Sequence, residues 1–218
     1  MKKLSFMALS LIVLLSSCFK EPKPEPTGEA KVRFANAAST SVAQDVYYNG
    51  RKVNIAPLAY GQVSGYQTIS SGASFFGFTD NGSTISNYES GATFKIGENW
   101  TVIYYTTTTN TKNVGFLLDD MSAPPTGKAR VRFVHLNSLF PSSFAIRIQE
   151  GANLVLVVPF ANSSAYFDVD AGTKFEVSAV GLIPSEQAFD PNIEAGKTYT
   201  IWLNGTATTM QAHTIQQN

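Results

Sequence analysis

The sequence predicts an all-β protein: two tandem immunoglobulin-like antiparallel β-sandwich domains that follow an N-terminal lipoprotein signal peptide. Three observations support this: only 15% of the residues are charged, which is below the usual quarter; strand and turn signals alternate along the chain; and the sequence contains an internal duplication. We expect residues 1–17 to be a removed signal peptide, 18–28 a lipidated tether, and 29–124 and 127–218 the two sandwich repeats.

The N-terminal segment has the layout of a secretory signal peptide. Lys2 and Lys3 form a short basic start, residues 4–15 form an apolar run, and two serines follow. A membrane-spanning helix needs about 20 apolar residues to cross about 30 Å of hydrocarbon, so this run is too short to be an anchor. The segment is therefore expected to direct export and then to be cleaved.

Cys18 is the only cysteine in the chain, so it cannot form an intramolecular disulfide. The preceding Leu-Ser-Ser resembles the lipobox of bacterial lipoproteins, in which an aliphatic and two small residues lead into the modified cysteine. The resemblance implies cleavage before Cys18, a diacylglyceryl group on its thiol and acylation of its amine. Each buried methylene contributes about 0.8 kcal/mol, so two or three chains hold a protein on a membrane. A catalytic or redox thiol would instead need a histidine partner in a folded pocket.

The residues after Cys18 predict a spacer. Residues 19–29, FKEPKPEPTGE, alternate proline with charge, which favours an extended polyproline-like chain that rises about 3.1 Å per residue and reaches roughly 30 Å. The expected location is the bacterial cell envelope, as an outer-membrane lipoprotein that faces the periplasm or the cell exterior. The membrane is thus a predicted partner through the lipid on Cys18.

The charge balance excludes nucleic acid as a partner. The chain has sixteen basic and sixteen acidic residues, and without Lys2 and Lys3 fourteen basic residues remain, which leaves a net charge of −2. A nucleic-acid module would show a basic balance or clustered Lys and Arg on one face. Neither is present in this sequence.

Three collinear matches reveal a tandem duplication. Residues 27–39, TGEAKVRFANAAS, recur from Thr126 as TGKARVRFVHLNS, an offset of 99 residues. YGQVSGYQTISSGASF from Tyr60 aligns with FANSSAYFDVDAGTKF from Phe160 at an offset of 100, which pairs Phe75 with Phe175, and GENWTVIY from Gly97 aligns with GKTYTIWL from Gly196 at 99. A unit of about 100 residues is the size of an independently folding domain. The short, proline-containing linker at 119–127 predicts that the two domains touch.

Turn signals divide each repeat into about seven or eight strands. Asn49-Gly50 lies between two β-prone runs, and Asn-Gly favours a two-residue hairpin because both positions need positive φ. Asp80-Asn81-Gly82 predicts a second hairpin, residues 99–109 form a long strand, and Asn204-Gly205 predicts a third hairpin. Turns every 8–12 residues are typical of an antiparallel sandwich. No segment shows helical periodicity over three turns.

These motifs resemble the bacterial domain of unknown function 4397 family. The resemblance rests on the strand VRFVH at 131–135 and its first-repeat counterpart VRFAN, on DVY at 45–47 and on YGQVSGY at 60–66. It implies tandem β-sandwich copies in an exported protein and no particular activity. The first repeat departs from the family pattern at Asn36, where a histidine is frequent, and the second reads FAIRIQEG at 144–151 where DVY is expected.

The sequence organises no catalytic, metal or cofactor site. His135 and His213 are the only histidines; a general base is conceivable at His135, and the alternative is a strand histidine that donates a hydrogen bond to a loop. GQVSG at 61–65 has its serine in the wrong place for a nucleophile elbow. Asp119 and Asp120 are adjacent, so on a strand they would point to opposite faces and could not act as a pair.

Three aromatic doublets are the best candidates for contacts. They are Tyr47-Tyr48, Phe75-Phe76 and Tyr104-Tyr105. Neighbours on a strand face opposite ways, so one member of each doublet must leave the core of its own sandwich. Tyr47, Phe76 and Tyr105 are the candidates for contact with an extracellular glycan or protein, or with the other domain, and the strand register decides which member of each doublet faces outward.

The sequence thus predicts a non-enzymatic, lipid-anchored envelope protein that acts as a binding, adhesion or scaffold module, with no cofactor. Two alternatives stay open. A surface-fibre subunit would need a removable edge strand and a protease site in the tether. A glycan or peptide hydrolase, or its accessory protein, would need convergent carboxylates in a cleft.

Overall fold

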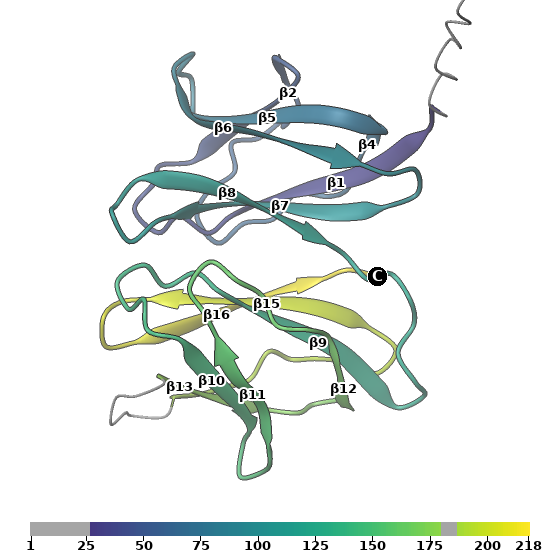
Figure 1. The fold of residues 1–218 in the computed structure, drawn as a ribbon, viewed down its shortest axis with the longest axis vertical. Coiled ribbons are helices and arrows are strands. Elements are labelled where there is room, and N and C mark those ends of the chain that lie inside the picture. The colour runs from purple at the N-terminus through teal and green to yellow at the C-terminus, as the bar shows by residue number, and fades with distance from the viewer. Residues whose placement is uncertain (1–26, 180–186) are drawn as a thin grey trace, which may run out of the picture.

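The computed structural model describes residues 27–179 and 187–218, and every described element is a β-strand or a connection between strands (Figure 1). The signal peptide, Cys18 and most of the predicted tether lie outside the described residues. No helix in the described part of the chain is long and apolar enough to cross a membrane. The first eight strands are β1 (Glu29–Asn36), β2 (Gln44–Tyr48), β3 (Arg51–Lys52), β4 (Gln67–Ser70), β5 (Gly72–Asp80), β6 (Ser86–Phe94), β7 (Asn99–Thr106) and β8 (Lys112–Leu118). The others are β9 (Lys128–His135), β10 (Phe144–Ile148), β11 (Asn153–Val158), β12 (Phe167–Asp170), β13 (Phe175–Ala179), β14 (Gln187–Phe189), β15 (Thr198–Gly205) and β16 (Met210–Gln216).

The strands form two sandwiches of matching topology, which confirms the predicted fold class. The first pairs sheet β4-β1-β7-β8 with sheet β3-β2-β5-β6, and the second pairs β12-β9-β15-β16 with β11-β10-β13-β14. One feature was not anticipated: β1 runs parallel to β7, and β9 runs parallel to β15. Each of these pairs joins the first strand of a repeat to a strand late in that repeat, so a long crossover allows the parallel direction.

Alternating side chains fill a separate apolar core in each sandwich. In the first, Phe34, Phe76, Phe78 and Phe94 are at most 1% exposed and pack against one another. The second is built around Phe133, Phe144, Phe175 and their neighbours. Phe76 and Phe78 lie at alternate positions of β5, which sends both rings to the inner face.

The two sandwiches pack through one sheet each. Figure 1 shows sheet β4-β1-β7-β8 facing sheet β12-β9-β15-β16, which places the other two sheets at opposite ends of the molecule. A third apolar cluster lies between these two facing sheets and is centred on Trp202, Ile103 and Tyr105. We call this contact region between the sandwiches the joint. The predicted contact between the domains is therefore confirmed.

Two of the three predicted hairpins turn where expected. Asn49 and Gly50 have φ values of 45° and 79°, and Gly82 has 79°. The third prediction is wrong: Asn204 and Gly205 belong to β15, and the turn lies at residues 206–209. Asn204 is 2% exposed because its side chain faces the joint, where Oδ1 accepts from the Tyr60 hydroxyl at 2.9 Å.

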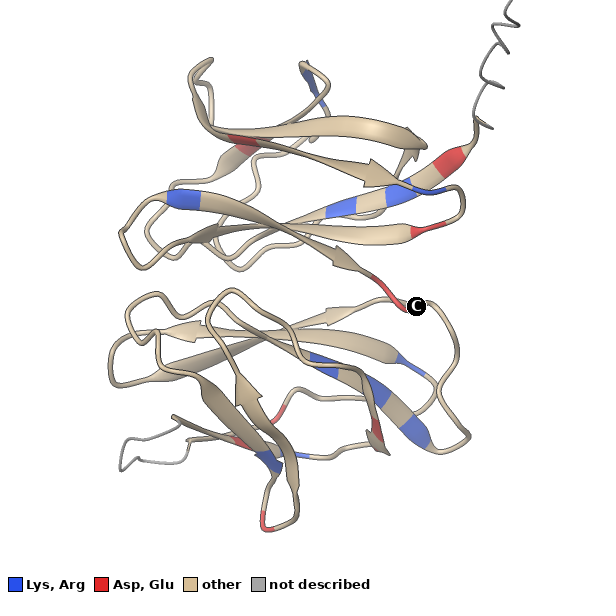
Figure 2. Cartoon of the chain, viewed as in Figure 1, with Lys and Arg blue, Asp and Glu red and all other residues tan. Residues whose placement is uncertain are grey.

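Charged residues are spread thinly over both sandwiches (Figure 2). The basic stripe along β9 consists of Lys128, Arg130 and Arg132, and each of them has a carboxylate partner at 2.6–2.9 Å. This stripe is thus neutralised within the protein.

Candidate functional site

In each aromatic doublet one member packs in the core of its own sandwich and the other faces away from it, as the alternation predicts, but the candidate Phe76 is the wrong member of its doublet. Phe76 is fully buried in the first core, whereas Phe75 is 65% exposed. Phe76 and Phe78 share a face of β5 and both pack against Phe34, which orients the whole strand. Phe75, and not Phe76, is therefore the outward member.

The other two candidate residues leave their own core in different directions. Tyr47 lies on the outer face of β2, partly exposed, while Tyr48 packs against the core. Tyr105 is 8% exposed and packs edge-to-face on Phe160 of the second sandwich, with ring centroids 6.2 Å apart. The structure brings Tyr47 together with Phe75 and places Tyr105 in the joint between the sandwiches.

Tyr47 begins a row of side chains across the outer face of sheet β3-β2-β5-β6. Its direct partners are Lys52 on β3 and Gly77 on β5, and Gly77 is in turn paired with Glu89 on β6. Phe75 lies two residues from Gly77 on the same face. Diagonal neighbours of this kind are about 7–8 Å apart, so the two aromatic rings border one surface.

Two glycines shape this surface. A Cβ on Gly91 would lie 2.9 Å from the Phe75 ring, so the ring rests directly on the Gly91 backbone. A Cβ on Gly77 would lie 3.3 Å from both Cγ and Oε1 of Glu89, so that side chain lies across Gly77. The absence of side chains at these positions lets the Phe75 ring pack close to the Gly91 backbone and makes a hollow beside Tyr47.

We call this hollow the outer trough. Its volume is about 650 Å³. The lining residues are Tyr47, Asn49, Gly50, Phe75, Phe76, Gly77, Thr79, Thr84, Ser86 and Glu89. It extends from the β2–β3 turn to the β5–β6 turn, both of which project from the first sandwich in Figure 1.

The trough has a single charged group in its lining, the carboxylate of Glu89. The nearby Lys52 ammonium is held by Asp45, with Nζ and Oδ1 2.7 Å apart. Burial alone would raise the pKa of Asp45, but hydrogen bonds from Lys52 and from the Gly82 N–H hold this pKa below its ordinary value. Asp45 thus stays ionised and the Lys52 charge is neutralised beside the trough.

The described strands of the second sandwich carry different side chains at the positions that match Tyr47 and Gly77. By strand register, Arg147 takes the place of Tyr47 and Glu176 the place of Gly77. These two side chains form an ion pair at 2.5 Å across β10 and β13. A cross-strand ion pair therefore covers the surface that is open in the first sandwich.

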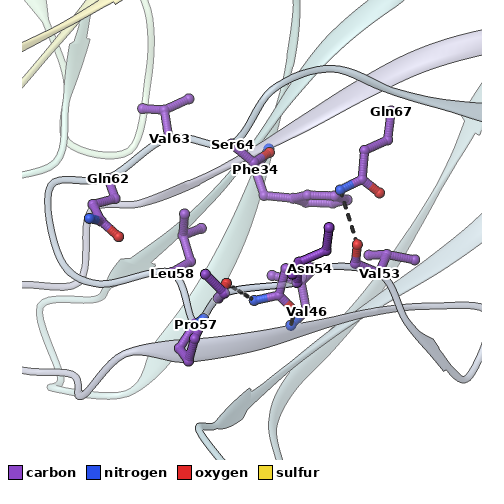
Figure 3. A pocket seen from close by; sticks show the side chains of 12 residues that line it. Phe34, Val46, Val53, Asn54, Pro57, Leu58, Gln62, Val63, Ser64 and Gln67 are labelled. Atoms are coloured by element: carbon purple, nitrogen blue, oxygen red, sulfur yellow. Dashed lines mark hydrogen bonds between the residues drawn. The ribbon is translucent and has the colours of Figure 1, made fainter.

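A second cavity of about 590 Å³ opens at the side of the first sandwich, between β4 and the segment after β3 (Figure 3). Phe34, Val46 and Leu58 form its apolar floor, and Gln62 and Gln67 lie at its rim. The floor residues are all at most 6% exposed, so they belong to the core of the first sandwich.

Asn54 explains why the chain leaves the sheet beside this cavity. Its Oδ1 accepts from Val46 N–H at 2.7 Å and its Nδ2 donates to Gln44 O at 3.0 Å, so the side chain takes the place of a strand on the edge of β2. A further bond from Nδ2 to Ala56 O shapes the bulge (Figure 3). The neighbouring Ile55 projects fully into solvent.

Comparison with known proteins identifies the family. The model named Domain of unknown function (DUF4397) matches residues 30–142, more than half of the 218 residues. The chain belongs to this family. The DUF4397 match covers β1 to β9, so it includes the first sandwich and the first strand of the second. No curated protein matches the sequence.

Solved structures show only distant likeness. The carbohydrate-binding module CBMbc (family CBM26) of Eubacterium rectale Amy13K, in complex with maltoheptaose, has a TM-score of 0.27 and 12% identity, and the alignment covers 87% of this chain and 98% of that one. The Bacillus anthracis TIE protein has a TM-score of 0.26 and 13% identity over 82% of this chain and 34% of that one. At these values the likeness says nothing of ligands or partners.

The DUF4397 motif VRF places an arginine of each repeat in the joint. Arg33 on β1 and Arg132 on β9 are both 4% exposed. Asp119, which follows β8, lies between them: its Oδ1 is 2.6 Å from Arg132 Nη2, and its Oδ2 is 3.5 Å from Arg33 Nη2. One buried carboxylate thus serves both guanidinium groups.

Each arginine also crosses to the other sandwich. Arg33 Nη1 donates to the carbonyl of Gln216, and Arg132 Nη1 donates to that of Leu118, both at 2.6 Å. Because the two bonds connect corresponding strands in opposite directions, the joint has approximate two-fold symmetry.

The second tyrosine of the YGQVSGY motif covers its arginine. The Tyr66 ring lies 4.6 Å from the Arg33 guanidinium carbon, and Tyr166 lies 4.9 Å from that of Arg132. The Tyr66 hydroxyl donates to Asp119 at 2.7 Å. Burial, followed by the neighbouring Asp119 charge, raises the pKa of Tyr66, so this hydroxyl remains a donor.

His135 is a structural histidine of the strand. Its Nε2 donates to Ser142 O at 3.0 Å and its Nδ1 accepts from Asn137 N–H at 3.2 Å, a pattern that requires the neutral ring. Burial lowers the pKa of His135 to about 4. In the first repeat, Asn36 donates to Leu58 O and accepts from Ala38 N–H, so the departure from the family histidine keeps both hydrogen bonds.

The other titratable candidates also lie in the joint. His213 stacks on Trp202 with ring centroids 4.7 Å apart, and its Nε2 is 3.2 Å from the Tyr60 hydroxyl. Burial lowers the pKa of His213. Asp120 faces away from Asp119 and pairs with Arg130 at 2.9 Å, as the alternation of neighbours predicts. The described residues contain no group of three or more acidic, His or Cys side chains placed to hold a metal.

Sequence reasoning named Tyr47 as a candidate, chose Phe76 instead of Phe75 from the second doublet, and did not single out Gly77 or Glu89. A usable signal was present in FFGF at 75–78: Phe76 and Phe78 share one face, and two phenylalanines at alternate positions indicate the inner face. The two glycines and Glu89 carry no signal, because their importance depends on which strand lies beside them.

Proposed function

We propose that the protein is a lipid-anchored, non-enzymatic binding module of the bacterial cell envelope, and that the outer trough of the first sandwich makes the contacts. The lipid on Cys18 would hold the mature chain on the outer membrane, in the periplasm or at the cell exterior. Residues 19–28 would space the sandwiches from the lipid surface.

One observation carries the binding role: two aromatic side chains, Tyr47 and Phe75, border a hollow on a rigid sheet that nothing else in the described chain covers. Phe75 is the most exposed aromatic side chain among the large hydrophobic residues at the surface. Leaving it in water forgoes roughly 1.5–3 kcal/mol of burial. The joint does not need it, since the sandwiches pack through the opposite sheet.

The carboxylates support a non-enzymatic role. Asp119 is engaged by two arginines and Asp45 by Lys52, while Glu89 is the single charged group of the trough. Glycoside hydrolysis uses two carboxyl groups on either side of the scissile bond. The trough lining does not supply such a pair.

The test uses residues 27–218 with an affinity tag, applied to a panel of immobilised neutral polysaccharides, acidic polysaccharides and proteins. The double variant Tyr47→Ala, Phe75→Ala should lose at least about tenfold in affinity for any panel member that the parent retains, since aromatic contacts dominate such surfaces. Arg147→Ala, at the position of Tyr47 in the second sandwich, is the matched control and should bind as the parent does. Unchanged binding by the double variant would contradict the proposal.

A further inference from the structure

We infer that the outer trough is a site for neutral polysaccharide, with the sugar chain running along β2 and β5. This inference rests on the proposed function and adds the ligand class. Three features of the trough support it: the exposed Phe75 ring, the pairing of the strands beneath it, and the charge of its lining.

The Phe75 ring is held against the sheet and is open to solvent. It lies beside the Gly91 backbone, so close that a Cβ there would be 2.9 Å from two ring carbons, and it is nevertheless 65% exposed. Flat apolar faces suit the apolar C–H faces of pyranose rings, and Tyr47 adds a second aromatic body diagonal to the first.

The two strands beneath Tyr47 and Gly77 leave no backbone groups free for an added peptide strand. β2 pairs with β3 and β5, and β5 pairs with β2 and β6, so the backbone groups under Tyr47 and Gly77 are already engaged in ladders. An extended peptide that binds by strand addition needs an exposed sheet edge. A sugar chain needs none, because its hydroxyl groups can bond to side chains.

The polar groups of the lining can form hydrogen bonds with the hydroxyl groups of a sugar. The hydroxyls of Thr84 and Ser86 can donate and accept, and the Asn49 amide anchors the turn by accepting from Phe75 N–H at 2.9 Å through Oδ1. The Glu89 carboxylate makes no ion pair or hydrogen bond within the described chain, so it is available as an acceptor.

The charge of the lining selects against acidic sugars. Glu89 is its sole charged residue, and the Lys52 ammonium, on the strand beside β2, is held by Asp45 at 2.7 Å. A uronic acid or sulfate in the trough would therefore meet a like charge, and no residue of the lining carries a cation to balance it. Among sugars, this lining favours neutral polysaccharide.

The second sandwich supplies an internal comparison. At the positions of Tyr47 and Gly77 it carries Arg147 and Glu176, which are joined in an ion pair at 2.5 Å. The inference therefore assigns one sugar site to each chain, on the first sandwich.

The experiment measures binding of the tagged 27–218 chain to matched soluble polysaccharides, one neutral and one containing uronic acid, by affinity electrophoresis and calorimetry. The parent should bind the neutral polymer at least about tenfold more tightly than the acidic one. Gly91→Ala keeps every aromatic residue but pushes the Phe75 ring off the sheet, and it should weaken neutral binding about tenfold. Glu89→Gln should strengthen binding of the acidic polymer and so reduce the preference for the neutral one. Arg147→Ala should bind both polymers as the parent does.

The outcomes separate the two proposals. Retention of protein ligands alone, lost in Tyr47→Ala with Phe75→Ala, would overturn the sugar assignment and leave the binding role intact. Equal binding of neutral and acidic polymers, or a Gly91→Ala variant that binds like the parent, would also overturn it. Binding unaffected by both aromatic substitutions would overturn the sugar assignment and the proposed function together. Circular dichroism and thermal unfolding of each variant verify that it is folded.

Discussion

At the scale of single residues, Asp119 connects the two repeats through several donors. Its two carboxylate oxygens accept from Arg33, Arg132, Tyr66, Thr101 and Gln217. The side chain has no exposed surface, and the two arginine side chains are 5% exposed. Removing one partner of a buried ion pair leaves an uncompensated charge, which is costly.

We therefore expect Asp119→Asn to lower the free energy of unfolding by about 3–5 kcal/mol, the typical effect of breaking a buried pair. Asp120→Asn is the control. Its carboxylate is 32% exposed and pairs with Arg130, so the loss should stay below about 1 kcal/mol. Urea denaturation of both variants measures the difference. Equal losses would show that Asp119 is not the centre of the joint.

His135 gives stability a dependence on pH. Its folded pKa of about 4 lies below the value of 6.5 for a free imidazole, because burial disfavours the charged ring. Between these values the unfolded chain binds the proton and the folded chain does not, so acidification favours unfolding. The contribution of the neutral His135 to the free energy of unfolding should therefore be fully present above pH 6.5 and fall by up to about 3 kcal/mol toward pH 4.

His135→Asn should remove most of this acid sensitivity. Asn36 makes the same two hydrogen bonds in the first repeat, so the substitution keeps the local structure. The free energy of unfolding is measured at pH 7.5, 5.5 and 4.5 for parent and variant. His213 also has a lowered pKa and would leave a residual slope. A variant as acid-sensitive as the parent would place the effect elsewhere.

At the scale of elements, the two repeats differ at the strand that follows β2 or β10. In the second sandwich β11 is a six-residue strand paired with β10. In the first, β3 has two residues and the Asn54 side chain substitutes for the missing ladder. This difference opens the side cavity in Figure 3.

Asn54→Ala should cost about 1–3 kcal/mol, because the Val46 N–H loses its acceptor. The adjacent Ile55→Ala is the control: the side chain is fully exposed, so stability should change by less than about 0.5 kcal/mol. Hydrogen exchange at the Val46 amide should accelerate in Asn54→Ala only. Slow exchange in that variant would mean that another acceptor replaces Asn54.

The strand registers also correct the alignment of the two repeats. The sequence alignment at an offset of 100 pairs Phe75 with Phe175. In the structure Phe175 is fully buried and pairs with Ile148, as Phe76 is buried and pairs with Tyr48. Phe76 is therefore the counterpart of Phe175, and the outward Phe75 belongs to the first repeat alone.

At the scale of the whole molecule, the joint sets the direction of each outer face. The sandwiches pack through sheets β4-β1-β7-β8 and β12-β9-β15-β16. The outer trough is on sheet β3-β2-β5-β6, so it lies at the end of the molecule farthest from the second sandwich (Figure 1). The predicted lipid-bearing residue, Cys18, precedes this same sandwich in the sequence. The trough and the predicted tether are thus neighbours along the chain.

Cys18→Ala should block lipid labelling and release the protein from the membrane fraction, since anchoring by acyl chains requires the thiol. Ser17→Ala is the control, because it keeps a small residue before the cysteine and should be labelled and retained normally. Metabolic labelling with a fatty acid and fractionation of the envelope provide the measurement. Labelled, membrane-bound Cys18→Ala would refute the lipoprotein assignment.

The sequence by itself determined the all-β class, the duplication, two hairpins and the contact between domains, because strand alternation, turn residues and repeated motifs are local signals. The tertiary structure alone decided that Phe75 faces outward, that Gly77 and Glu89 complete its surface, and that Arg33, Asp119 and Arg132 meet. A register shift of one residue reverses the faces of a strand. Asp119 lies 86 residues after Arg33, and only the packing of two complete sandwiches brings their charges together.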